Sequence, residues 1–231
     1  MTINNNSKMR TAALAWLSCF VVHLLPAAAP AMRSYTIDLP QNVLRFSLPE
    51  EIAQHMGPRL IDKSFDPSTN KTFKRDGFRD LVSMYYQIQG PFLVGPYGAL
   101  RFDFTVVRRV DGYEGDITTV DGLERYVRWW IGGMPENRDF SFGQAELAGV
   151  KWVFRWRNTM GGGGVNAADV QAFSFPIDQT SFLRVDFWIS ETVPGSAPKW
   201  KPRAEALREA IKATVVLQPK VLPSSTGAPP R

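Results

Sequence analysis

Residues 150–157 read VKWVFRWR and alternate large apolar with mostly basic side chains. Apolar side chains occupy every second position from Val150 to Trp156, and the opposite face carries Lys151, Arg155 and Arg157. A repeat of two residues indicates a β-strand, because successive side chains of a strand point to opposite faces. We therefore predict a strand with its apolar face against a core, a pattern typical of an antiparallel sheet.

The same alternation continues on both sides of this stretch. Residues 102–106 and 183–189 repeat it, with Phe, Val, Leu and Ile on one face and Asp103 or Asp186 on the other. Weaker patterns of the same kind predict further strands at 35–39, 43–48, 81–88 and 170–175.

Two stretches have helical spacing instead. Residues 121–131 carry apolar side chains every three or four positions, with Asp121 and Glu124 in a capping-box pattern and Gly132-Gly133 at the end. The second helix starts with Pro202 in its first turn, with Leu207, Ala210, Ile211 and Thr214 inward and Glu205, Arg208, Glu209 and Lys212 outward. Together these elements predict an α+β fold, an antiparallel sheet flanked by helices.

The N-terminus has the pattern of an export signal. Lys8 and Arg10 precede an apolar run over residues 11–25, and small residues follow around Ala29 and Ala31. We expect residues 1–31 to be a signal peptide removed after export. Two alternatives are an uncleaved membrane anchor and a lipoprotein attached through Cys19, which the bulky Trp16 disfavours.

Removal of the leader changes the inventory of side chains. Cys19, His23, Lys8 and Arg10 leave with it, so 25 basic and 22 acidic side chains remain and the formal charge falls from +5 to +3. So small an excess does not favour nucleic acid as a partner. A chain without cysteine suits an oxidising compartment, so we expect a periplasmic protein.

The exported part reads as one domain and a tail. We expect residues 32–217 to form a single α+β binding domain. Residues 218–231 are rich in Pro and Ser, and we expect them to be a disordered tail.

Little of the chemistry of catalysis remains in the exported part. His55 is its one histidine, and no G-x-S-x-G motif provides a nucleophile for it to activate. Zinc would need more His or Cys ligands, and residues 111–116 lack the spacing of an EF-hand, so they read as a turn. Residues 161–164 are four glycines without the Lys of a phosphate loop and predict a hairpin loop. We expect no cofactor, no metal and no catalytic residue.

Paired carboxylates are the one enzyme chemistry that the composition permits. A glycosidase needs two acids roughly 5–10 Å apart, and Asp103, Asp186 and Glu146 each lie on or beside a predicted strand. Ion pairs across the sheet account for these acids without catalysis. The expected basic partners are Arg101, Arg155 and Arg184.

A patch of Trp and Arg is the strongest candidate for a binding surface. Trp129, Arg125 and Arg128 lie off the buried face of the first helix, with Arg155 and Arg157 on the basic strand face. Exposed Trp and Arg commonly anchor protein interfaces. We add Lys199 and Trp200, which precede the second helix, to the exposed set. Two readings stay open: an interface, or a Trp129 packed under a loop beside solvated arginines.

The layout resembles a known architecture. Residues 35–40 (YTIDLP) and 43–49 (VLRFSLP) suggest two early strands, 115–121 (GDITTVD) leads into the first helix, and 182–190 runs through a Pro/Gly loop to the second. This order is similar to the Mog1/PsbP/DcrB-like α/β/α sandwich, a family of non-enzymatic binding domains. It also resembles periplasmic immunity proteins that block toxins of type VI secretion.

This resemblance implies a function through contact with another molecule. We expect a periplasmic, non-enzymatic protein, most specifically an immunity protein that occludes a secreted effector toxin, with its basic face meeting acids around the toxin's cleft. Membrane contact is expected through an uncleaved leader alone. Two alternatives remain: an envelope assembly or lipid-carrying factor, and an envelope hydrolase that uses acidic residues.

Overall fold

A computed structural model describes residues 31–55, 59–60, 63–65, 73, 77–90, 95–133, 139–160 and 167–220. Residues 1–30 of the expected signal peptide, the glycines at 161–164 and the end of the expected tail lie outside these residues. The elements in chain order are β1 (Met32–Asp38), β2 (Asn42–Pro49), α1 (Glu50–His55), β3 (Arg59–Leu60), β4 (Phe78–Gln89), β5 (Pro96–Arg108), α2 (Val120–Gly132), β6 (Ser141–Leu147), β7 (Val150–Asn158), β8 (Ala168–Pro176), β9 (Ser181–Glu191), α3 (Ala197–Lys212) and β10 (Val216–Pro219).

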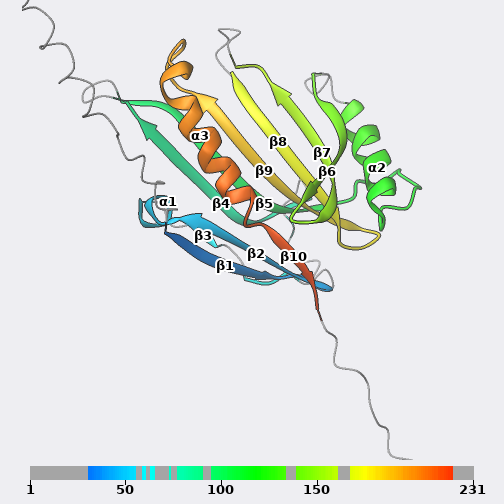
Figure 1. Cartoon of the computed structure of the whole chain (residues 1–231). Coiled ribbons are helices and arrows are strands. Elements are labelled where there is room, and N and C mark those ends of the chain that lie inside the picture. Colours follow the sequence, from blue (N-terminus) through cyan, green and yellow to red (C-terminus); the bar gives the residue numbers. More distant parts are fainter. Residues whose placement is uncertain are drawn as a thin grey trace, which may run out of the picture. The chain divides into compact units, whose positions relative to one another are not determined.

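The strands form two antiparallel sheets. One has the order β1-β2-β10, and the other has the order β3-β4-β5-β9-β8-β7-β6 (Figure 1). The α+β class with antiparallel strands flanked by helices is thus confirmed, although the sequence did not indicate that the first two strands pair with the last in a sheet of their own. β10 ends at Pro219, two residues past the expected domain end.

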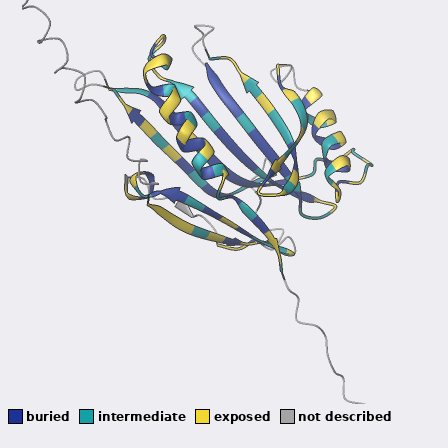
Figure 2. Cartoon of the chain, in the orientation of Figure 1, coloured by how far each residue is buried: buried dark blue, intermediate teal, exposed yellow. Residues whose placement is uncertain are grey.

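The main core lies between the two sheets and under α3. The ring of Phe46 on β2 contacts Phe104 on β5 at 4.6 Å between centroids, and Ile211 of α3 is fully buried in the same cluster. Helix α3 packs against β2, β5 and β9, and Figure 2 shows its buried stripe facing the strands. This face of the large sheet carries the apolar side chains that the alternation predicted.

The second face of the large sheet is covered at one end by α2. Val107, Val153 and Phe182 project from three strands and are buried against Leu123 and Tyr126 of that helix. Val153 lies between the basic positions of β7, so this face is not a continuous solvated surface. Both faces of the large sheet therefore contribute buried side chains, whereas the sequence pattern predicted that only one face would pack against a core.

The N-terminal ends of α2 and α3 differ from the expected ones, whereas α2 ends at Gly132 with Gly133 as its C-cap, as predicted. Thr119, not Asp121, caps α2, because its hydroxyl accepts a hydrogen bond from the Gly122 N–H at 3.1 Å. Helix α3 begins five residues earlier than expected, at Ala197, so Pro202 lies inside it. That earlier start places Trp200 within the helix and buries it against Gly98, so Trp200 does not belong to the exposed set.

Arg208 is the clearest exception to the helical pattern. It was expected to point outward, but its side chain is 6% exposed and donates to Asp169 on β8 at 2.7 Å. The indole N–H of Trp156 donates to the other carboxylate oxygen of Asp169 at 3.2 Å. The ion pair with Asp169 compensates for the burial of the Arg208 charge on the side of α3 that faces the sheet.

Candidate functional site

Helix α2 presents one apolar and one polar face. Its apolar face packs on the sheet, while Arg125, Arg128 and Trp129 point away from it and are exposed. Figure 2 shows this outward face of α2 as exposed along its length. The expectation that these three residues lie off the buried face is confirmed.

Trp129 is the most exposed large apolar side chain among the described residues, at 49%. Its ring lies 5.2 Å from Tyr113 and 6.0 Å from Tyr126, between centroids. Tyr126 is fully buried, and its hydroxyl accepts a hydrogen bond from the Val110 N–H at 2.9 Å. The two tyrosine rings thus contact one side of the indole and leave its other side exposed to solvent.

The segment between β5 and α2 is fastened to the β8–β9 turn. The Gly115 carbonyl accepts hydrogen bonds from Arg109 and Gln179, and Gln179 in turn accepts one from the Ile117 N–H. Residues 111–116, interpreted above as a turn, form no cluster of metal-ligating side chains among the described residues. Because this segment carries Tyr113, these bonds fix the support of Trp129.

The charges of this surface are partly paired. Arg128 donates to Glu124 at 2.7 and 2.9 Å and lies 5.1 Å from the ring of Phe142. Burial works to raise the pKa of Glu124, but hydrogen bonds from Arg128 and Gln144 lower it below its usual value. Asp116 accepts two bonds from Thr118, and these bonds lower its pKa as well.

Arg155 and Arg157 occupy a different environment from the residues of α2. Their guanidinium groups lie 4.5 and 4.7 Å from the ring of Phe140, and the side chain of Arg155 is 12% exposed. Burial lowers the pKa of Arg155 to about 10, while Asp186, 4.0 Å away, opposes that shift. These contacts hold Arg155 inside the sheet surface, so it offers little area to a partner.

The acids considered for catalysis divide into a pair and an outlier. Asp103 and Asp186 lie directly opposite each other on the neighbouring strands β5 and β9. Glu146 lies on the edge strand β6, opposite Lys151 of β7 in the strand register. Asp103 accepts from Ser83 at 2.6 Å, and burial raises its pKa despite that bond. Arg101, Arg155 and Arg184 do pair with these acids. The Arg155–Asp186 pair crosses the sheet as expected, whereas Arg101–Asp103 and Arg184–Asp186 each join residues of one strand.

The pair of aspartates has little access to solvent. The side chains of Asp103 and Asp186 are 8% and 3% exposed. A substrate would have to displace the paired arginines to reach either carboxylate. The arrangement resembles a buried ion-pair network more than a general acid and base facing a cleft.

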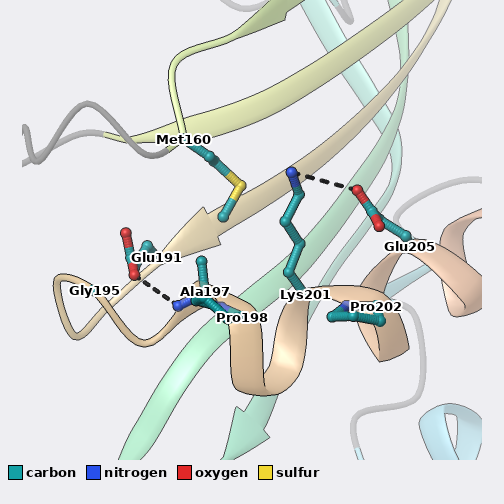
Figure 3. A pocket seen from close by; sticks show the side chains of 8 residues that line it. All are labelled: Met160, Glu191, Gly195, Ala197, Pro198, Lys201, Pro202 and Glu205. Atoms are coloured by element: carbon teal, nitrogen blue, oxygen red, sulfur yellow. Dashed lines mark hydrogen bonds and ion pairs between the residues drawn. The ribbon is translucent and has the colours of Figure 1, made fainter.

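A pocket that the sequence did not indicate lies at the start of α3. Its volume is about 470 Å³, and Figure 3 shows it between the end of β9, the first turns of α3 and the end of β7. Lys201 pairs with Glu205 at 3.5 Å, and Glu191 accepts from the Ala197 N–H at 2.9 Å. The other lining residues are Met160, Gly195, Pro198 and Pro202. The signal in the sequence is the Pro-Gly-Ser-Ala-Pro segment at 194–198, which spaces the strand from the helix.

Comparisons with known proteins place few limits on the function. No family model matches the chain, and no curated protein matches it. Among solved structures, the crystal structure of LpqN, involved in cell envelope biogenesis of Mycobacterium tuberculosis, is similar with a TM-score of 0.41 and 8% identity over 82% of this chain and 92% of that chain. At that score the likeness carries no conclusion about function, and the resemblance to the Mog1/PsbP/DcrB-like family is not confirmed.

Two further findings concern the helices and His55. Within the described residues, no helix is long and apolar enough to cross a membrane. His55 is the last residue of α1, and its side chain lies outside what the structure describes. The exposed Trp129, supported by Tyr113, makes the α2 surface the candidate site; it consists of Tyr113, Arg125, Arg128 and Trp129.

Proposed function

We propose that this chain is an exported, non-enzymatic protein that binds a protein partner through the α2 surface. The observation that carries the proposal is Trp129: a large indole held at 49% exposure by two tyrosines. An exposed tryptophan that is already fixed loses little rotamer entropy on binding, and Trp is among the residues that most often dominate interfaces.

The finer form of the proposal is an immunity protein of the periplasm that occludes a type VI secretion toxin. It is supported by the leader pattern, by the absence of cysteine from the expected mature chain and by the scarcity of catalytic side chains in the sequence. An inhibitor needs no chemistry of its own, since shape and a few anchors suffice to cover an active site.

Site-specific photo-cross-linking tests the proposal. A photoreactive phenylalanine analogue at position 129 of the full chain, expressed in its natural host, should capture one protein in the envelope fraction. The same analogue at Tyr85, which is 41% exposed on β4 away from α2, is the matched control and should not capture it. Equal capture from both positions, or none from position 129, would rule out the α2 surface.

A second candidate, a carrier of a small apolar ligand, is favoured by the pocket at α3. Met160, Pro198 and Pro202 give it an apolar lining, and its size falls within the range of small-molecule sites. Solvent extraction of the purified full chain, followed by mass spectrometry, should find a stoichiometric lipid if this function holds. If the protein purified from its natural host contained no bound lipid, that result would argue against the carrier function.

A further inference from the structure

We propose that the α2 surface is shaped for a cationic partner, a protein that offers an apolar pocket for Trp129 within a rim of Lys and Arg side chains. This inference rests on the proposed function and names the chemistry of its partner. It also reverses the charge expected from the sequence, where the arginines were taken to face an acidic partner.

The segment that carries the α2 surface, residues 109–133, has a charge opposite to that of the chain. Residues 109–133 contain five acidic side chains and three arginines, a net charge of −2, whereas the whole chain carries +5. Four of these acids, Asp111, Glu114, Asp116 and Asp121, are exposed. Two of them flank Tyr113, the residue whose ring contacts Trp129. The indole therefore stands beside an acidic rim.

The three arginines of this segment offset its five acids only in part. Arg128 is committed to Glu124 at 2.7 Å, and Arg109 donates to the Gly115 carbonyl at 3.3 Å. Among the described residues Arg125 forms no salt bridge within 4.0 Å, and its coupling to Asp116 is a minor cause of that residue's lowered pKa. In the part of the chain that the structure describes, Asp111 and Glu114 form no salt bridge within 4.0 Å.

Two of the acids are fixed in position before any partner arrives. Asp116 accepts from both the N–H and the hydroxyl of Thr118 at 2.8 Å. Asp121 accepts from Gln144 on β6 at 2.7 Å. Both acids lie at the N-terminal end of α2, on the same segment as the exposed Asp111 and Glu114. A fixed excess of negative charge on one segment steers a cationic surface toward it and disfavours partners of the same sign. Nucleic acid and anionic lipid are therefore poor occupants of this surface.

Charge reversal with a matched control tests the inference. The variant Asp111→Lys with Glu114→Lys changes the surface by four units beside Trp129. The control, Glu51→Lys with Glu205→Lys, makes the same change on α1 and α3, where both acids pair with exposed or half-exposed cations. Each full-chain variant, checked for unchanged thermal unfolding, is titrated by surface plasmon resonance against the protein captured from position 129.

We expect reversal on the α2 surface to slow association about tenfold at low salt, with a much smaller change in the control. Added salt should slow association of the unaltered chain. The idea of a cationic partner would be overturned if the charge-reversed variant associated as fast as the unaltered chain, or faster, while Trp129→Ala still weakened binding. The proposed function would then stand. Trp129-dependent binding to phosphatidylglycerol vesicles or to a DNA duplex would also overturn it. Failure to capture any protein from position 129 would remove the proposed function, and this inference with it.

Discussion

Arg208 and Asp169 form a buried ion pair at 2.7 Å between α3 and β8, with side chains 6% and 4% exposed. The pair sits at the margin of the main core and connects the last helix to the large sheet. Removing one partner of such a pair leaves a charge without compensation in a poorly solvated place, which costs more than the pair itself contributes.

Replacing Arg208 should therefore destabilise the protein strongly. We expect Arg208→Met to lower the free energy of unfolding by about 3–5 kcal/mol in urea titrations. The double variant Arg208→Met with Asp169→Leu should recover much of that loss. A matched exposed pair, Arg203 with Glu51, should lose less than about 1 kcal/mol on Arg203→Ala. Equal losses at the two arginines would contradict the buried pair.

Gly98 permits the close packing of Trp200 on β5. A Cβ atom at Gly98 would lie 2.3 Å from the indole of Trp200, far inside van der Waals contact. We expect Gly98→Ala to lower the melting temperature by several degrees, because a buried ring in a packed core has little room to move. Gly132→Ala is the control, since nothing lies within 4 Å of its added Cβ and alanine favours a helix. A Gly98 variant as stable as the Gly132 variant would show that Trp200 is loosely packed.

Asp103 should give the stability of the fold a characteristic dependence on pH. Burial raises the pKa of Asp103 in the folded state above its usual value of 3.8. Between pH 3.8 and the raised pKa, Asp103 holds its proton more often in the folded than in the unfolded state. Protonated Asp103 therefore stabilises the fold fully below pH 3.8, and this contribution is lost as pH rises through the raised pKa.

The comparison of Asp103→Asn with the unaltered chain isolates that effect. The free energy of unfolding of the unaltered chain should fall relative to the variant as pH rises through this window. A difference that grows in the opposite direction would mean that Arg101 and Ser83 outweigh burial.

The strands were predictable because their alternation is strong and local. The stretch at 150–157 became β7, and the stretches at 102–106 and 183–189 became parts of β5 and β9. β6 and β10 were not predicted: β6 is an edge strand with few buried residues, and β10 is four residues long. The pairing of β10 with β2 depends on contacts far apart in the sequence, which no local pattern encodes.

The candidate site was predictable in part. Helical spacing placed Trp129, Arg125 and Arg128 on one outward face, and the structure agrees. The same reasoning treated Arg155 as an outward cation, but it did not detect Phe140, whose ring covers the guanidinium. It also missed the acidic rim, because the contact of Tyr113 with Trp129 joins a turn to a helix sixteen residues later. Charge sums over the whole chain conceal such local patches.

Trp129 is the anchor of the proposed interface. The most direct measurement is calorimetric titration of the captured partner with the full chain, with Trp129→Ala and with Tyr85→Ala. We predict that Trp129→Ala weakens binding by about 2 kcal/mol or more, with unchanged thermal unfolding, and that Tyr85→Ala binds like the unaltered chain. Equal affinity of all three proteins would contradict the account.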